Sequence, residues 1–300
     1  MSPRIKALRA FGTAITVLNI LGHTVLGFEQ SFIQLLTAVF TAYLVEVIIE
    51  FADSKVNKRK PAYHGGLSNK IDFLIPAHIS GLAIGMLVYA NNEVLPFAFA
   101  ASIAIVTKTI FQVSIQGTKK HFLNPSNTGI AVTLLLFPWI SIAPPYHFSE
   151  NLKDEWDIIF PLIILILGSM LNIRLTKKGP LIAAWLGGFV LQALIRSIFT
   201  DSSLISALLP MTGLAFLLFT FYMVTDPGTT PFKRRNQIVF GFSVAAVYGV
   251  LMIFDVVFTL FFSLFIVCLV RGCYHFIKSL LSHKNQKLEE CRVCTKELQL

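Results

Sequence analysis

Residues 32–51 have the sequence FIQLLTAVFTAYLVEVIIEF, in which only Glu46 and Glu50 carry a charge. An α-helix of this length crosses the hydrocarbon core of a bilayer, which needs about 20 mainly apolar residues. Hydropathy marks ten such segments, near residues 11–28, 32–51, 73–90, 95–114, 128–143, 157–173, 180–199, 204–224, 237–253 and 256–277. The sequence therefore predicts an all-α, polytopic integral membrane protein with about ten transmembrane helices.

The composition of the whole chain agrees with this fold class. Of its 300 residues, 55% are hydrophobic and 14% are charged, and the mean hydropathy is +0.70. These values lie well outside the range of soluble proteins. Ten crossings leave only short loops and no room for a large soluble domain. We expect a single transmembrane domain over residues 1–277, with halves of about 11–143 and 157–277, and a cytoplasmic tail over 278–300.

The net charge of +9 comes from basic residues that lie between the apolar segments. Nucleic-acid-binding proteins gather such residues on one face beside base-stacking aromatics, so the expected partner is the lipid bilayer and not nucleic acid. With ten helices, all but three of the 25 Lys and Arg residues fall on one side; Lys108 lies within a segment, and Lys153 and Arg196 lie opposite. Because basic loops stay in the cytoplasm, both termini are predicted to be cytoplasmic.

An Asx-Pro pair follows the fourth and the eighth predicted helices, as Asn124-Pro125 and Asp226-Pro227. In each pair the polar side chain can cap the helix that the proline starts. The two turns lie on the same side of the membrane, so they are either two ordinary helix caps or parts of one polar site. Ten helices also divide as five plus five, and an odd-numbered unit that is duplicated inserts upside down, which predicts an inverted repeat.

Two ordered motifs resemble a known membrane family. The first comprises residues 104–108 (AIVTK), 122–125 (FLNP) and 129–138 (GIAVTLLLFP), and the second is residues 221–227 (FYMVTDP). They are similar to motifs of the B subunit of the sodium-translocating NADH:quinone reductase and the D subunit of the Rnf electron-transport complex. Two further segments, Asp72 to Leu82 and Ile142 to Phe148, resemble the branch of this family that is found with enediyne biosynthesis genes.

The resemblance implies a bacterial inner-membrane protein that transfers electrons together with other membrane or redox subunits. If the chain is part of an enzyme, it is a redox subunit of a larger membrane oxidoreductase. The family holds a non-covalent flavin, riboflavin or FMN, near the two Asx-Pro turns. The residues that match these motifs, and are the candidate cofactor-binding residues, are Asn124, Asn127, Thr225, Asp226 and Lys108.

The family's covalent flavin is not expected in this chain. In the family an FMN is joined by a phosphoester to a threonine in the loop between helices five and six. Here that loop, roughly Ser141 to Asp157, contains no threonine, and no Ser-Gly-Ala-Thr sequence occurs anywhere. The full electron path of the family is therefore not carried over.

Other polar residues in the apolar segments have simpler interpretations. Lys108 is close enough to the cytoplasmic end of its helix to extend to the headgroups. Glu46 and Glu50, four residues apart near the cytoplasmic end of their helix, form an acidic face near the headgroups or pair with Lys108. His78, next to Pro76, either is a satisfied interior histidine or marks a helix break that lines a cavity. The tail motif Cys291-Arg-Val-Cys294 is half of a zinc site at most, and a disordered tail without metal is the simpler prediction.

Three functions stay open at this point. The first is a flavin-binding electron-transfer protein. The second is a small-molecule transporter or channel, because a five-plus-five arrangement with polar breaks also describes carriers. The third is a membrane scaffold for a biosynthetic or redox complex. No nucleophile motif, phosphate loop or metal motif is present, so no catalytic residue and no metal site are assigned.

Overall fold

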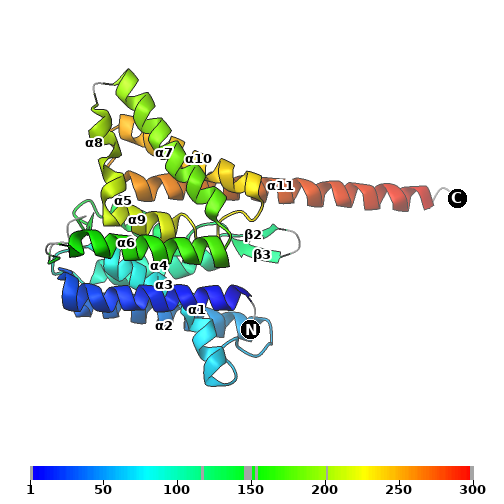
Figure 1. Cartoon of the computed structure of the whole chain (residues 1–300). Helices are drawn as coiled ribbons and strands as arrows, with labels where there is room; N and C mark the ends of the chain where they lie inside the picture. Colours follow the sequence, from blue (N-terminus) through cyan, green and yellow to red (C-terminus); the bar gives the residue numbers. More distant parts are fainter. Residues whose placement is uncertain (1–2, 116–117, 145–150, 153–154, 201, 298–300) are drawn as a thin grey trace.

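The computed structural model describes residues 3–115, 118–144, 151–152, 155–200 and 202–297. Long helices lie side by side in one bundle, and the start of the first helix lies toward the end of the bundle from which the last helix projects (Figure 1). The predicted all-α class is confirmed. Strands occur in the described residues only as two short antiparallel pairs.

The first half contains five helices and a π-helical turn: α1 (Pro3–Leu21), η1 (Gly22–Leu26), α2 (Phe32–Val56), α3 (Leu67–Leu87), α4 (Leu95–Ile110) and α5 (Pro125–Leu136). Strand β1 (Val88–Tyr89) pairs with β4 (Ser141–Ile142), with Val88 opposite Ile142. Strand β2 (Gln112–Ile115) pairs with β3 (Thr118–His121), with Gln112 opposite His121. The two short pairs thus flank α4 and α5.

The second half is more broken. Its elements are α6 (Trp156–Met170), η3 (Leu171–Leu175), α7 (Gly179–Phe199), α8 (Leu204–Leu208), η4 (Leu209–Thr212), α9 (Leu214–Leu218), η5 (Phe219–Met223), α10 (Arg234–Ile253) and α11 (Thr259–Glu297). Both η3 and η5 are π-helical turns, which often occur inside helices at functional sites.

Six helices in the described residues are long and apolar enough to span a bilayer: α1 with η1, α2, α3, α7, α10 and the part of α11 up to Leu281. The segment from α8 to η5 is bent by 68° and would count as a seventh span. Several of these helices keep large apolar side chains on the outside, for example Phe40 and Leu44 on α2. Exposed apolar surface of this extent needs a nonaqueous environment, and the protein is a multi-pass membrane protein.

Ten full spans are not confirmed, although each predicted range contains a helix in the described residues. Helix α4 has 16 residues because the chain leaves it at Phe111 to form the β2–β3 hairpin. Helix α5 has only 12 residues, about 18 Å, whereas the hydrocarbon core is about 30 Å thick. It ends at Leu136 because Pro138 disfavours helix at the residue before it.

Small residues bring α7 and α10 into close contact. Ala184 and Gly188 on α7 face Gly241 and Ala245 on α10, four residues apart on each helix. A Cβ atom added to Gly241 would lie 2.6 Å from the carbonyl oxygen of Leu181, and one added to Gly188 would lie 2.8 Å from the Cβ of Ala245. This is the spacing with which membrane helices pack closely in the absence of a hydrophobic driving force.

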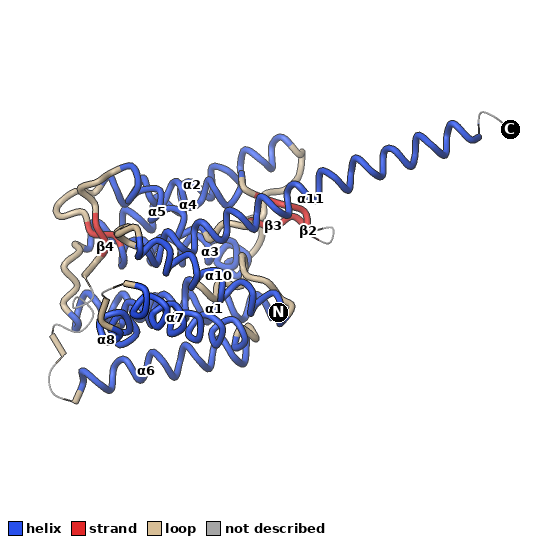
Figure 2. The backbone as a smooth tube through the Cα atoms, turned by 90° about the horizontal axis from the view of Figure 1, so that it is seen from above, coloured by secondary structure: helices blue, strands red, loops and turns tan. Residues whose placement is uncertain are grey.

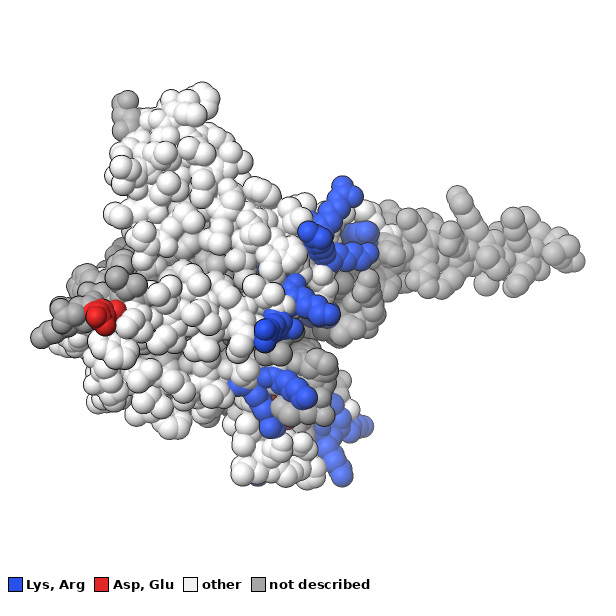
Figure 3. Space-filling view, viewed as in Figure 1, with Lys and Arg blue, Asp and Glu red and all other residues white. Residues whose placement is uncertain are grey.

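Charge separates along the bundle. Figure 3 shows the visible Lys and Arg side chains together at the end where the β2–β3 hairpin lies, and an acidic group at the opposite end. The bundle therefore has one strongly basic end.

The tail that the sequence predicts to be disordered is helical in the structure. Helix α11 has 39 residues and continues past the bundle to Glu297, and Figures 1 and 2 both show this part without a neighbour. Cys291 and Cys294 lie on it, but their side chains are outside the described part. Of the other two cysteines, Cys268 is buried and Cys273 is exposed.

Candidate functional site

Asn124 starts α5 as predicted. Its backbone is extended, Pro125 occupies the first helical turn, and its side-chain Oδ1 accepts hydrogen bonds from the backbone N–H of Asn127 and the hydroxyl of Ser126, both at 3.0 Å. Its Nδ2 donates to the main-chain carbonyl of Met223 at 3.1 Å. The buried side chain therefore caps α5 and also joins it to the end of η5.

Asp226 does not cap a helix, so that prediction is wrong. Its Oδ1 accepts from the backbone N–H of Gly228 at 3.2 Å, and its Oδ2 accepts from the hydroxyl of Thr229 at 2.8 Å. The next helix, α10, begins only at Arg234. Pro231 lacks an N–H and disfavours helix at the residue before it, so the chain forms a compact turn first. We call residues 226–232 the Asp226 turn.

Polar side chains from several elements converge on the backbone of η5 and of the connection from η5 to α10. Each donates to a main-chain oxygen: Asn172 to Phe221 (2.8 Å), Asn124 to Met223 (3.1 Å), Arg271 to Thr229, Lys178 to Pro231 (2.9 Å) and Gln237 to Phe232 (3.2 Å). A bent span leaves carbonyl groups without helical partners, and buried carbonyls need donors. These side chains therefore hold the break in place.

The structure brings four of the five candidate residues to this region. Thr225 is fully buried, and its hydroxyl donates to the carbonyl of Phe221 at 2.6 Å. Asn127 donates from Nδ2 to the carbonyl of Phe261 at 3.0 Å. Lys108 is different, because its Nζ lies 2.6 Å from both carboxylate oxygens of Glu46 on α2. The alternative in which Lys108 pairs with Glu46 is therefore the observed one.

His78 has protein partners on both ring nitrogens. The hydroxyl of Tyr43 lies 2.6 Å from Nδ1 and the hydroxyl of Thr16 lies 2.8 Å from Nε2. Because the Thr16 hydroxyl also bonds the carbonyl of Gly12, it can accept a hydrogen bond from Nε2–H while Tyr43 donates to Nδ1. His78 is thus a hydrogen-bonded histidine inside a continuous α3, as one of the two alternatives predicts.

Two polar atoms at the start of α5 have no hydrogen-bond partner in the described residues. They are Oδ1 of Asn127 and Oγ1 of Thr128, and both are buried. The carbonyl of Phe261 fixes the orientation of the Asn127 amide, since only the NH₂ group can donate to it. Buried polar atoms are nearly always paired, so these two atoms are available to a ligand or a water molecule.

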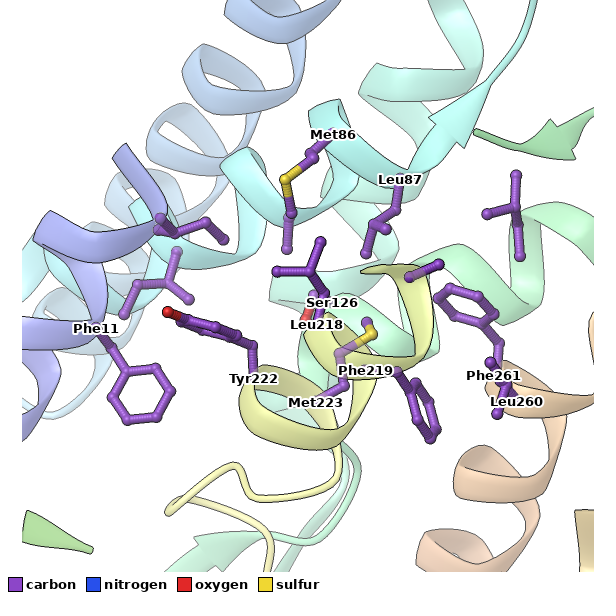
Figure 4. A pocket seen from close by; sticks show the side chains of 15 residues that line it. Phe11, Met86, Leu87, Ser126, Leu218, Phe219, Tyr222, Met223, Leu260 and Phe261 are labelled. Carbon is purple, nitrogen blue, oxygen red and sulfur yellow. The ribbon is translucent and has the colours of Figure 1, made fainter. Parts of the chain in front are cut away.

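A cavity of about 50 Å³ lies between elements of the two halves, and Ser126, which precedes Asn127 in the sequence, is one of its lining residues. Its lining includes Phe11 of α1, Met86 of α3, Ser126 of α5, Tyr222 of η5 and Phe261 of α11 (Figure 4). The surface is mainly aromatic and aliphatic, with the hydroxyls of Ser126 and Tyr222 as polar groups. The volume admits a few water molecules. Sequence reasoning missed this cavity, because its walls come from distant segments.

Lys178 is the second feature that the sequence did not reveal. It precedes α7, is 0% exposed, and donates to the carbonyls of Pro231 and Thr230. Burial lowers the pKa of Lys178 to about 8; Asp226 opposes this shift, whereas Arg271 and Lys120 reinforce it. In the sequence Lys178 is one of several loop lysines, and no local signal marks it as buried.

No group of three His, Cys, Asp or Glu side chains that could hold a metal ion occurs among the residues that the structure describes. The chain matches no protein-family model and no curated protein. The function therefore has to be argued from the two motifs and from the geometry of the site.

Proposed function

We propose that the protein is a membrane electron-transfer protein that binds a non-covalent flavin between its two halves, as one subunit of a larger redox complex. The observation that carries this proposal is the unpaired Oδ1 of Asn127, with Oγ1 of Thr128, at the start of α5. A buried polar atom without a partner costs about 1–3 kcal/mol. The isoalloxazine ring of a flavin offers N–H and C=O groups along one edge and can satisfy both atoms.

The composition of the cavity lining suits a flat aromatic ligand. Aromatic side chains and Met86 line the cavity, and Ser126 and Tyr222 add two hydroxyls. The N-terminus of α5 carries a partial positive charge, which favours a reduced, anionic flavin. The chain's residues would bind and orient the ring and exclude water, and a bound flavin would supply the redox chemistry.

The size of the cavity sets a condition on this proposal. A volume of about 50 Å³ is too small for a three-ring system, so binding requires side chains of η5 to move. Tyr222 and Met223 narrow the cavity from the side of the bent span (Figure 4). A π-helical turn is a plausible place for such a movement, because its backbone is already irregular.

We also infer that the two halves form a five-plus-five inverted repeat. Four helix contacts of the first half (α1 with α3, α2 with α3, α2 with α4, and α4 with α5) have counterparts in the second (α6 with α9, α7 with α8, α7 with α10, and α10 with α11). The first helix of each half also ends in a π-helical turn, η1 or η3. These correspondences support a duplicated unit.

A matching polar contact in each half supports the same inference. Gln30, just before α2, donates to the carbonyls of Met86 and Val88, where the third helix ends. Lys178, just before α7, donates to the carbonyls of Thr230 and Pro231, in the connection after η5. In both halves a side chain that precedes the second helix thus binds the backbone between the third and fourth helices.

The proposed setting is the bacterial inner membrane, with ten membrane segments and both termini in the cytoplasm. It is supported by the Lys and Arg side chains that gather at one end of the bundle (Figure 3). In this arrangement α5 and the bent segment from α8 to η5 are discontinuous elements that meet at the cavity.

A transporter is the second candidate, and the short helix α5 favours it. Carriers place half-length helices with their N-termini at a binding site between two repeats, and α5 begins beside the cavity that separates the halves. A solute instead of a flavin would then pair with Asn127.

The absorption spectrum of the detergent-purified protein tests the proposal. We expect a flavin spectrum, with the chromophore released into the supernatant by acid because no covalent bond is formed. Asn127→Ala should lower the flavin content of the folded protein, and it should cost no more than about 1–3 kcal/mol of stability, since it removes one donor to the carbonyl of Phe261. Asn57→Ala, a change at an exposed asparagine on the end of α2, is the matched control. A colourless wild type, or full flavin content in Asn127→Ala, would favour the transporter or a scaffold.

A further inference from the structure

Three cationic side chains surround the Asp226 turn. The Nζ atoms of Lys120 and Lys178 lie 4.6 and 5.0 Å from the centroid of the Phe232 ring, and Arg271 donates to the carbonyl of Thr229. They come from β3, from the residue before α7 and from α11, which are far apart in the sequence. The tertiary fold therefore assembles this basic cluster, which we define as Lys120, Lys178 and Arg271.

One carboxylate, Asp226, belongs to the turn that the basic cluster surrounds. Both of its oxygens already accept hydrogen bonds inside the turn, from Gly228 and Thr229. It attracts Lys178 electrostatically, whereas Arg271 and Lys120 repel Lys178. Positive charge thus exceeds negative charge in a partly buried place, and this excess is unfavourable without a further anion.

The basic cluster has hydrogen-bond donors to spare. The guanidinium of Arg271 carries five N–H groups, and in the described residues the only hydrogen bond it makes is to the carbonyl of Thr229. Among the described residues, Nζ of Lys120 lies over the face of the Phe232 ring and has no hydrogen-bond acceptor. Lys178 is enclosed and contributes its charge, while Arg271 and Lys120 can contact a ligand directly.

The position of the basic cluster indicates which anion it meets. Lys120 of this cluster belongs to β3, whose hairpin lies at the basic end of the bundle (Figures 1 and 3), and it lies next to a Phe232 side chain that is 70% exposed. At the end of a membrane bundle, Lys and Arg side chains lie at the level of the lipid headgroups. Basic pockets between helices at this level bind the phosphate groups of anionic lipids.

We propose that Arg271 and Lys120, above the buried Lys178, form a binding site for an anionic phosphate group on the Asp226 turn. The phosphate belongs either to a lipid headgroup or to a soluble phosphate. The site shares no residue with the cavity lined by Ser126 and Tyr222, and it does not depend on flavin binding. Occupation would tie together α7, α11 and the connection to α10, and so stabilise the break in the eighth helical segment.

The experiment measures thermal unfolding of the protein in neutral detergent against the concentration of added phosphatidylglycerol, with phosphatidylcholine as the uncharged comparison. A parallel titration uses inorganic phosphate. The variants are Arg271→Gln and Lys120→Gln, and the control is Arg235→Gln, which removes an exposed charge near the start of α10 but outside the basic cluster. The wild type and the control should be stabilised by phosphatidylglycerol and not by phosphatidylcholine.

Each of the two variants should need about fivefold more phosphatidylglycerol for the same stabilisation, because a basic residue near an anionic surface contributes about 1 kcal/mol. Stabilisation by inorganic phosphate, lost in the same variants, would assign the site to a soluble phosphate. If Arg271→Gln does not fold, Lys120→Gln still decides, since Lys120 donates no hydrogen bond in the described residues. Equal responses of all variants, or no response of the wild type to either ligand, would overturn the proposal.

Discussion

The side-chain amide of Asn124 donates a hydrogen bond of 3.1 Å to the main-chain carbonyl of Met223, 99 residues further along the chain. The oxygen of the same side chain caps α5. One residue therefore fixes the start of α5, the shortest helix of the first half, and the end of the bent segment. A loss of this side chain should affect both halves of the bundle at once.

Asn124→Ala should lower the free energy of unfolding by about 2–4 kcal/mol. Loss of the cap costs about 1 kcal/mol, and the unpaired carbonyl of Met223 adds about 1–3 kcal/mol. The Asn124→Ser variant keeps a capping oxygen and lacks the amide donor, so it should be intermediate. Unfolding in detergent measures these differences, with Asn57→Ala as the control. A loss no larger than that of the control would contradict the two roles of Asn124.

The stability contributed by Lys178 should depend on pH. Its pKa in the folded protein is about 8, below the usual value of 10.5. Between these values the unfolded chain binds a proton that the folded chain does not, so the free energy of unfolding rises with pH. The wild type should therefore gain stability relative to Lys178→Met from pH 8 to pH 10, by at most about 3 kcal/mol. A constant difference between the two proteins over this range would show that burial does not disfavour the charge.

Two glycines offer a matched test of helix packing. Gly241→Ala places a Cβ 2.6 Å from the carbonyl oxygen of Leu181, so α10 must move away from α7 and the protein should lose stability by more than 1 kcal/mol. Gly187 lies on α7 with open space beside it. Gly187→Ala should therefore stabilise α7 by about 0.5–1 kcal/mol. Melting temperatures that shift in the same direction would contradict the close approach of the two helices.

The pair of Lys108 and Glu46 should behave as a coupled unit. Both side chains are mostly buried, so either charge alone would lie uncompensated between α2 and α4. Lys108→Met and Glu46→Gln should each lower the free energy of unfolding, because each leaves the other charge without its partner. The double variant should be about 1–3 kcal/mol more stable than the sum of the two single effects predicts. Flavin content should stay unchanged in all three variants. A decrease of flavin in Lys108→Met alone would return Lys108 to the cofactor site.

The orientation can be tested with reporter fusions. A reporter at Lys153, which lies outside the described residues, should be extracytoplasmic, and one at the C-terminus should be cytoplasmic. This follows because all but three of the 25 Lys and Arg residues fall on one side in the ten-helix arrangement. With a cytoplasmic N-terminus, a cytoplasmic reporter at Lys153 would require an even number of crossings before it and would contradict the ten-helix arrangement.

The parts that could be predicted from the sequence are those with a local cause. Hydropathy locates the helices, and the Asn124-Pro125 pair identifies the cap of α5, because a cap involves only neighbouring residues. The short length of α5 could also have been predicted from Pro138. The predicted fourth helix, residues 95–114, includes most of β2, because the alternating residues of β2 continue the apolar run of α4. The β2–β3 hairpin is nevertheless also a local feature.

The parts that could not be predicted have distant causes. Lys178 becomes buried only because the Asp226 turn folds over it. The cavity exists only because Phe11, Ser126 and Tyr222 meet across three separate elements. Asp226 carries the same motif as Asn124, yet a second proline, Pro231, delays the next helix and changes its role. Composition contains none of this information.

The long helix α11 has a consequence for the helix–coil equilibrium of the C-terminal tail. A polar helix of about sixteen residues is marginal on its own in water, because forming the first turn is costly. Here the membrane-embedded part of α11 provides that first turn, and residues 282–297 only extend it. They form a rod of about 24 Å that unwinds from its free end. Warming would therefore convert this rod gradually into a flexible chain from its free end, without any change in the bundle.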